Sequence, residues 1–325
     1  MKPTQRLFLI INPISGTHSK LSIAHHLVDE LRSRGFDVTA EFTLGAGDAT
    51  RLARQAIDGG YDGVLAWGGD GTVNEIATAM TGTGVPMGIV PAGSGNGLAR
   101  HLNIPIDSLA SVAVIAGRHI VDCDHGTVNG RPFFCTFGIG FDAAVSTRFA
   151  ASGTRGKLNY VRSALQEFIN YESTSYRIIA DGEELNDDAF LIAVCNAAQY
   201  GNNAYIAPGA SLTDGYLDLV VVRKMPRLNL VMLGMELMAG TLREGKGVTT
   251  RKVREVTIYT DSRVPAHIDG EPIDNIGNEI HVSCRPRALR LFTNPSETVF
   301  HPIITPVQAL FNDMGLAFHK YFGQT

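Results

Sequence analysis

The stretch from residue 61 to residue 80 constrains the fold more than any other part of the chain. Its apolar run, Val64 to Trp67, is typical of a strand that is buried on both faces. Three glycines follow within four positions. After them, apolar residues recur at the spacing of one helix face, at Val73, Ile76, Ala77 and Met80. The stretch predicts a strand, a glycine turn and a helix that begins directly after the turn.

A glycine turn of this kind is suited to a phosphate group. Glycine has no Cβ, so the backbone can approach a ligand closely, and the free N–H groups at a helix start can donate to phosphate oxygens. Asp70 lies inside the turn, where its carboxylate would repel phosphate unless it faces a divalent cation or a substrate hydroxyl. A tight turn without a ligand is the alternative interpretation.

A second turn of the same type makes that alternative less attractive. Residues 87–90 predict another buried strand, the segment from Pro91 to Gly97 is again rich in glycine, and Leu98 begins another helix. Two such turns indicate that two neighbouring strand ends face one ligand.

Strands and helices alternate throughout residues 1–120. Further strands are predicted at 7–11 and 36–42, and further helices at 21–34, 47–59 and 108–117. This alternation predicts an α/β domain with a parallel, doubly wound sheet and helices on both faces. Ligands of such sheets bind beyond the carboxyl ends of the strands. The segments expected at that edge are 12–16, Thr43, 68–74 and 93–96.

The pattern changes after residue 120, because strand-like segments now follow one another. They are expected at 119–128, 132–138, 174–181, 189–195, 216–223, 251–260, 263–268, 278–283 and 287–292, with helices at 156–170 and 227–240. Such a run of strands predicts a mainly antiparallel domain over residues 121–295, a β-sandwich or else an open barrel. Residues 296–325 are expected to form a helical tail that docks on the first domain.

Composition excludes some classes of protein. A chain of 325 residues suits two domains, and its net charge of −4 offers no electrostatic case for binding nucleic acid. No stretch is long and apolar enough to span a bilayer. The cysteines are far apart and lack metal-ligand spacing, so they predict buried free thiols in a reducing cytoplasm. A homodimer is left open.

Six motifs occur in one order along nearly the whole chain. They are Asn12-Pro13-x-Ser15-Gly16, Gly68-Gly69-Asp70-Gly71-Thr72, Pro91-x-Gly93-Ser94-Gly95-Asn96, Asp124-x-Gly126, Asp214-Gly215-x-Leu217-Asp218 and Asp269-Gly270-Glu271. This set resembles the diacylglycerol kinase catalytic family, which also contains sphingosine and ceramide kinases. A single glycine motif would be weak evidence, because NAD kinases and phosphofructokinases resemble it too; the ordered set is specific.

The resemblance implies a role for each matching position. ATP would be held by Asn12, Pro13, Ile14, Ser15, Gly16, Thr43, Gly68, Gly69, Asp70, Gly71, Thr72, Val73, Asn74, Gly93, Ser94, Gly95 and Asn96. Glu271, with Asp269 beside it, would lie across the cleft between the domains and accept the proton of the lipid hydroxyl. Asp70 and Asp124 would support the catalytic magnesium. A second, structural magnesium would be held by Asp214 with main-chain oxygens of Ser211 and Tyr216.

One position departs from the pattern of the bacterial diacylglycerol kinases. Those enzymes carry an aspartate directly after the asparagine of the second glycine loop, whereas this chain has Gly97 after Asn96. Here the loop resembles that of the sphingosine kinases. The departure weakens one role in the magnesium network and leaves the lipid open.

We therefore expect an ATP- and magnesium-dependent kinase that phosphorylates a primary hydroxyl of diacylglycerol or a sphingoid base, in transient peripheral contact with the membrane. The apolar helix at 156–170 is a candidate wall for the acyl chain. An NAD kinase-like enzyme with a soluble acceptor is one alternative, which the acidic motifs at 214–218 and 269–271 disfavour. A non-catalytic nucleotide-binding regulator is another, which the intact Asp70 and Glu271 disfavour. Arg100 and His101 are expected to face solvent, or in the case of Arg100 equally well a phosphate.

Overall fold

The computed structural model describes residues 4–15, 23–151, 171, 173–200, 204–245 and 247–294. The predicted helix at 156–170, the predicted tail at 296–325 and Gly16 lie outside the described residues.

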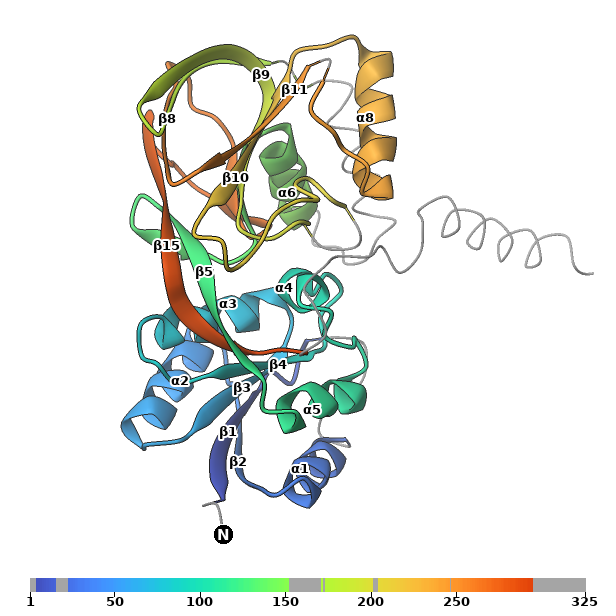
Figure 1. Cartoon of the computed structure of the whole chain (residues 1–325), viewed down its shortest axis with the longest axis vertical. Helices are drawn as coiled ribbons and strands as arrows, with labels where there is room; N and C mark the ends of the chain where they lie inside the picture. The colour runs from blue at the N-terminus through green and yellow to red at the C-terminus, as the bar shows by residue number, and fades with distance from the viewer. Residues whose placement is uncertain are drawn as a thin grey trace, which may run out of the picture.

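The first part of the chain forms a parallel sheet in the strand order β4-β3-β1-β2. Its strands are β1 (Gln5–Ile11), β2 (Phe36–Phe42), β3 (Gly63–Gly68) and β4 (Met87–Pro91). Its helices are α1 (Ala24–Ser33), α2 (Asp48–Asp58), α3 (Asp70–Met80), α4 (Gly97–His101) and α5 (Ser108–Ala116). In the register, Leu7 of β1 lies opposite Val38 of β2 and Gly63 of β3. These helices cover both faces of the sheet (Figure 1).

Alternate residues of β1 belong to two different cores, which explains its unbroken apolar sequence. Phe8 and Ile10 pack with residues of α2 and α3, whereas Leu7, Leu9 and Ile11 pack with residues of α1 and α5. Side chains alternate along a strand, so a sheet covered on both faces requires apolar residues at every position. The predicted doubly wound sheet is confirmed. Its strand order reverses between β1 and β3, and the loops after these strands open at the edge where ligands bind.

The second part of the chain is mainly antiparallel, as predicted. Its elements are β5 (Ile120–Val128), β6 (Arg131–Phe133), β7 (Thr136–Gly140), α6 (Phe141–Ala151), β8 (Thr174–Ala180), β9 (Glu183–Cys195), β10 (Leu217–Arg223), α8 (Arg227–Ala239), β11 (Val248–Val253), β12 (Glu255–Tyr259), β13 (Ala266–Ile268), β14 (Glu271–Ile273) and β15 (Glu279–Phe292). One buried cluster fills the space between its strands. A second cluster packs α8 against β9 and β10.

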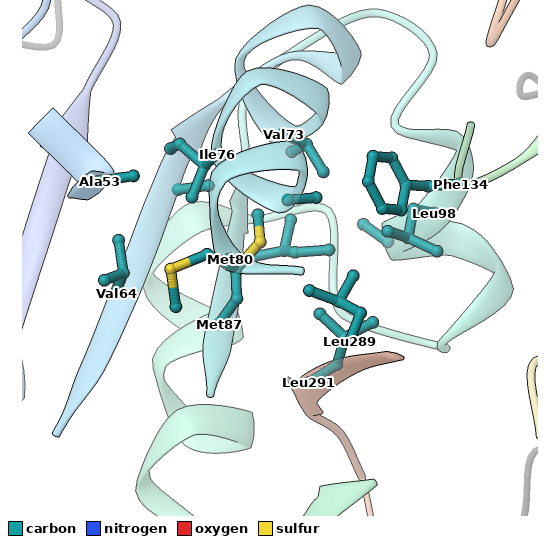
Figure 2. Close-up of a cluster of buried hydrophobic side chains, with 14 of the residues drawn as sticks. Ala53, Val64, Val73, Ile76, Met80, Met87, Leu98, Phe134, Leu289 and Leu291 are labelled. Carbon is teal, nitrogen blue, oxygen red and sulfur yellow. The ribbon is translucent and has the colours of Figure 1, made fainter. Parts of the chain in front are cut away.

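Two long strands join the two parts. β5 pairs with β15 from Val128↔Val282 to Ile120↔Phe292, and the end of β15 also pairs with β4 of the first sheet. Both strands run from the upper to the lower half of the molecule (Figure 1). Leu289 and Leu291 of β15 share a core with Met87 and other residues of the first part, and Phe134 lies beside Leu98 (Figure 2). The two parts therefore share hydrophobic core as well as a continuous sheet.

Some predicted boundaries were wrong. The single strand expected at 132–138 is broken between β6 and β7, because the backbone N–H groups there donate to the side chain of Asp269. The strand expected at 251–260 divides at Arg254, whose N–H donates to Asp181. Conversely, the strands expected at 278–283 and 287–292 are one strand with an irregularity between Arg285 and Leu289. Helix α6 was not predicted, because its described side chains are largely buried and leave no polar stripe.

Among the helices that the structure describes, none combines the length and the apolar character needed to cross a bilayer.

Candidate active site

The two glycine turns touch each other at the carboxyl edge of the first sheet. A Cβ on Gly93 would lie 2.6 Å from the Cα of Gly69, and a Cβ on Gly69 would lie 3.2 Å from the Cα of Gly93. Real Cβ atoms do not approach backbone as closely as the first distance. The turns after β3 and β4 are therefore in direct backbone contact, which only glycine permits at residue 93.

The loop after β1 joins this pair of turns through Thr72. The side-chain N–H of Asn12 donates to Thr72 Oγ1 at 2.9 Å, and the side-chain oxygen of Asn12, Oδ1, accepts from the N–H of Ile14 at 3.1 Å. A Cβ on Gly68 would lie 2.4 Å from the Cβ of Thr72. Thr72 thus occupies the space that a side chain at residue 68 would need, and it holds the loop of Asn12 against the start of α3.

Asp70 faces backbone amides. Its Oδ2 accepts from the N–H of Asn96 at 2.9 Å, and its Oδ1 accepts from the N–H of Gly97 at 2.7 Å. These donors compensate its negative charge within the glycine turn, an arrangement for which the sequence carried no signal. The carboxylate fixes the second glycine loop relative to the first, because it begins α3 and binds the start of α4.

Gly97 stands at a confined position. A Cβ there would lie 3.3 Å from Cys135 Sγ, 3.7 Å from Asp70 Oδ1 and 3.7 Å from the carbonyl oxygen of Tyr200. A carboxylate at residue 97 would therefore need room that Cys135 partly fills, beside the negative charge of Asp70.

The Asp269-Gly270 pair forms a tight hairpin turn between β13 and β14. Both residues have positive φ, 50° and 84°, as a two-residue type I′ turn requires. The Asp269 carboxylate accepts hydrogen bonds at both of its oxygens. Its Oδ1 accepts from the N–H of Cys135 at 2.7 Å and of Thr136 at 2.8 Å. Oδ2 accepts from the N–H of Phe134 and from the Asn74 side chain, both at 2.9 Å.

Asp269 therefore ties the turn to both parts of the molecule. Asn74 belongs to α3 of the first part, whereas the other donors belong to the break between β6 and β7. Burial raises the pKa of Asp269, and the three backbone hydrogen bonds oppose that rise. With every lone pair directed at a donor, this carboxylate has the geometry of a structural anchor.

Glu271 follows the turn and reaches across to the first part. Its Oε1 lies 2.9 Å from the position that a Cβ on Gly71 would take, at the start of α3. Its side chain is exposed, and within the part of the chain that the structure describes no donor pairs with its carboxylate. The structure thus brings a carboxylate from one part over the phosphate-type turn of the other.

Alanine at Gly71 and alanine at Gly93 are expected to have opposite signatures. At residue 71 the added methyl meets only the end of the Glu271 side chain, which can move away. We expect kcat to fall about tenfold or more while the melting temperature is kept, since alanine favours a helix over glycine. At residue 93 the methyl meets backbone, so we expect a loss of roughly 1–3 kcal/mol in the free energy of unfolding.

The measurements are steady-state kinetics and urea unfolding of both variants. Gly234→Ala in α8 is the matched control, because a Cβ there has nothing within 4 Å. Equal loss of stability in Gly71→Ala and Gly93→Ala would contradict the assignment of Glu271 to this turn.

The remaining predicted nucleotide residues lie around these turns in different ways. Thr43 follows β2, and its N–H donates to Ile11 at 2.8 Å. Ser94 and Ile14 are exposed on their loops, and the side chain of Ser15 donates to the Asn12 backbone carbonyl at 3.1 Å. Val73 is buried in the core, so its side chain faces away from the turn.

The predicted metal residues form a second, separate cluster. Asp124 is buried, and its carboxylate accepts from the N–H of Gly215 and of Arg287, both at 2.7 Å. It therefore lies with the loop of Ser211, Asp214 and Tyr216, and both of its oxygens are engaged there. Its hydrogen bonds stabilise this loop and the irregularity in β15.

A lysine forms an ion pair with the carboxylate of that loop. Lys252 Nζ lies 2.7 Å from Asp214 Oδ2 and 3.3 Å from Asp218 Oδ2, while Asp214 Oδ1 accepts from the N–H of Tyr216 at 3.1 Å. The ammonium group already provides the positive charge, so the residues as placed do not fit a structural magnesium. Over the described ranges, no group of three or more His, Cys, Asp or Glu side chains is arranged to hold a metal ion.

The glycine turns fit a nucleotide-bound magnesium better. Asp70 brings its carboxylate to the start of α3, where each of its oxygens accepts one hydrogen bond and keeps a second lone pair, and oxygen is the ligand type that magnesium prefers. Magnesium in kinase sites is held by one or two carboxylates together with substrate phosphates, so a larger cluster of acidic residues is not required here.

The sequence-based expectation was wrong for one residue near the site, His101, and gave no role to another, Glu75. His101 was expected at the surface, but it is buried, and its Nδ1 accepts from the N–H of Ala198 at 3.0 Å. Glu75 was not singled out, yet its carboxylate accepts from the N–H groups of Gly47 and Thr50 at the start of α2. Glu75 lies inside the predicted helix that follows the glycine turn, and its local sequence carried no signal for this long-range cap. Arg100 donates to the Gly95 carbonyl at 2.8 Å and braces the second glycine loop.

Because His101 is buried, we expect the protein to lose stability in acid. Burial lowers its pKa to about 4 in the folded protein, whereas an unfolded histidine has a pKa of about 6.5. The unfolded chain therefore binds a proton first as the pH falls. This contribution to stability is complete above about pH 6.5 and declines toward pH 4, by at most about 3 kcal/mol.

Urea unfolding of His101→Asn measured at pH 7.5 and pH 4.5 tests the effect. Asparagine keeps an acceptor for the Ala198 N–H but cannot titrate in this range, so its loss of stability on acidification should be smaller than that of the wild type. An identical loss in both proteins would contradict the prediction.

Both parts of the chain resemble known proteins. Residues 6–128 match the diacylglycerol kinase catalytic domain, and residues 136–293 match the YegS C-terminal NAD kinase beta sandwich-like domain. A diacylglycerol kinase from Mycobacterium tuberculosis is 30% identical over 284 residues, which cover 81% of this chain and 91% of that protein. A YegS-like lipid kinase from Chromohalobacter salexigens is 30% identical over 271 residues, covering 82% and 86%.

A solved structure has the same fold. The crystal structure of a diacylglycerol kinase from Bacillus anthracis matches with a TM-score of 0.73 at 20% identity, covering 91% of this chain and 99% of that one. The likeness includes both the parallel sheet and the antiparallel part.

Proposed function

This chain belongs to the diacylglycerol kinase catalytic-domain family, and from that premise we propose that it transfers the γ-phosphate of ATP to a primary hydroxyl of a lipid. Diacylglycerol and a sphingoid base are the candidate acceptors. The observation that carries the proposal is the position of Glu271, which reaches from β14 to within 2.9 Å of where a Cβ on Gly71 would be.

The residues divide the work between the two parts of the molecule. The glycine turns after β3 and β4, with the start of α3, present close backbone and N–H groups to phosphate oxygens. Asn12 and Thr72 hold the neighbouring loop in place. These elements bind and orient the nucleotide, and positioning of this kind is the main demand of phosphoryl transfer.

Glu271 is the general base in this proposal. Its carboxylate would accept the proton of the acceptor hydroxyl as that oxygen attacks the γ-phosphorus and the bond to the bridging oxygen of ADP breaks. Asp269 acts only by anchoring the turn. Magnesium, when bound with the nucleotide near Asp70, would neutralise charge on the phosphates.

The acceptor sets two further expectations. Its hydroxyl must lie between the glycine turns and Glu271, so its apolar chains would extend toward the second part. A lipid acceptor also requires transient contact with a membrane surface. Flotation with vesicles that contain anionic lipid tests this contact, and failure to float with any vesicle would count against a membrane-derived substrate.

Transfer of labelled phosphate from ATP by the purified protein with magnesium tests the activity. Diacylglycerol, monoacylglycerol, sphingosine, dihydrosphingosine and ceramide would be offered separately in mixed micelles, with NAD as a soluble acceptor. Label in one lipid class is the expected result and names the branch of the family. Label only in NADP would overturn the proposal in favour of the NAD kinase-like alternative.

A further inference from the structure

A buried carboxylate–imidazole pair lies directly behind the turn that carries Glu271. Asp142 is the second residue of α6 and His267 belongs to β13, and their exposed fractions are 8% and 1%. His267 Nε2 lies 3.2 Å from Asp142 Oδ2, and His267 Nδ1 accepts from the N–H of Gly270 at 3.2 Å. The imidazole therefore links α6 to the turn.

The backbone is shaped to accommodate this pair. A Cβ on Gly138 of β7 would lie 2.4 Å from both Asp142 Oδ2 and His267 Nε2. Gly138 pairs directly with His267 across the two strands. Any side chain at residue 138 would therefore separate the carboxylate from the imidazole.

The hydrogen bonds determine where the proton lies on the imidazole. Because the N–H of Gly270 donates to Nδ1, Nδ1 must carry no proton. The single proton of the neutral ring is then on Nε2, where Asp142 Oδ2 accepts it. A proton on Nδ1 would instead set two donors, the ring N–H and the Gly270 N–H, against each other.

Asp142 is itself held in place from two sides. Its Oδ1 accepts from the N–H of Ala143 at 2.8 Å, at the start of α6, and its Oδ2 accepts from the hydroxyl of Tyr200 at 2.7 Å. The first turn of a helix also stabilises a negative charge. The carboxylate is therefore a fixed acceptor for the Nε2 proton of His267.

We propose that Asp142 and His267 are positioning residues that aim Glu271 at the glycine turn. Asp142 selects the Nε2–H form of His267, and His267 Nδ1 then holds the N–H of Gly270, one residue before Glu271. Asp269 anchors one side of the same turn through its carboxylate, and His267 anchors the other through Gly270. The proposal deepens the proposed function and rests on it.

Replacing His267 separates this role from simple packing. Leucine fills the buried site but offers no acceptor, so His267→Leu should lower kcat about tenfold to a hundredfold, the range expected for a displaced catalytic group. Asparagine places an oxygen near the position of Nδ1, so His267→Asn should recover part of kcat. The KM for ATP should stay unchanged in both variants, because the nucleotide turns belong to the first part.

Asp142→Asn supplies a second line of evidence. The NH₂ group of the asparagine must face either the N–H of Ala143 or the Nε2–H of His267. Either orientation therefore sets two donors against each other, and kcat should fall. Asp122→Asn is the matched control, since that carboxylate pairs only with the guanidinium groups of Arg287 and Arg290 in the part of the chain that the structure describes. It should behave as wild type.

Nitrogen-15 NMR of the histidine side chains in the wild type gives a readout independent of activity. His267, assigned by comparison with His267→Asn, should carry its proton on Nε2. A proton on Nδ1 would overturn the proposal, as would wild-type kcat in His267→Leu or equal losses in His267→Leu and His267→Asn. If the wild type phosphorylates no acceptor, the proposed function fails, and the proton position alone then decides whether the link to Gly270 exists.

Discussion

Glu271→Gln should lower kcat for lipid phosphorylation by about 10²–10⁴-fold, the usual contribution of a general base. Glutamine has nearly the same shape, so it keeps the contact with the start of α3 but cannot accept a proton. The KM for ATP should change little, because the nucleotide-binding turns do not depend on this carboxylate. Steady-state transfer of labelled phosphate, with ATP and lipid varied in turn, measures both constants.

Glu279→Gln is the matched control for this variant. Glu279 is also exposed in the second part, where it contacts Tyr259 and His281 at the start of β15. Its replacement should leave kcat unchanged. Full turnover by Glu271→Gln would remove the assignment of Glu271 as the base, while leaving the fold and the nucleotide turns as they are.

Asp269→Asn should destabilise the protein and inactivate it together. Asparagine tolerates the positive φ of this position, so the change tests the carboxylate alone. In the asparagine, one carboxylate oxygen is replaced by an NH₂ group, which cannot accept. That group faces either the donors of Phe134 and Asn74 or those of Cys135 and Thr136, depending on the orientation of the amide. Leaving such buried donors unpaired costs about 1–3 kcal/mol each.

Urea unfolding at pH 7.5 and phosphate-transfer kinetics test this variant. We expect a loss of at least about 2 kcal/mol in the free energy of unfolding, with a fall in kcat because the turn before Glu271 loses its anchor. Asp181→Asn is the control, since Asp181 also has a positive φ of 47° in a hairpin turn and accepts from backbone N–H groups, of Arg254 and Glu255, but it is exposed, so water can replace those bonds. If the two variants lost equal stability, the anchoring role of Asp269 would be wrong.

The candidate site could be predicted from sequence where its residues are consecutive. Gly68 to Thr72 and the second glycine loop occupy the strand ends where the alternation of strands and helices placed them. Their local sequence carries both the strand and the turn, so distance along the chain does not matter. The same reasoning failed for His101, because its hydrogen-bond partner, the N–H of Ala198, is far away in the sequence.

The long-range contacts of the carboxylates could not be predicted from the sequence. The Asp70 carboxylate accepts from the N–H groups of Asn96 and Gly97, a pairing for which the sequence carried no signal. Asp124, which was predicted to support the same magnesium as Asp70, accepts from the N–H groups of Gly215 and Arg287. A carboxylate can accept a hydrogen bond from an amide or an ammonium group and can also coordinate a metal ion, so residue type alone does not select among these partners.

The sequence by itself determined the doubly wound first sheet, the antiparallel second part and the order of the acidic and glycine motifs, because these depend on local periodicity and on the conformational freedom of glycine. Only the tertiary structure decided what each carboxylate does. It placed Asp269 among four donors, paired Asp214 with Lys252 and left Glu271 exposed over Gly71. The reason is that the role of a charged group depends on the donors around it, and here the folded chain brings those donors from distant segments.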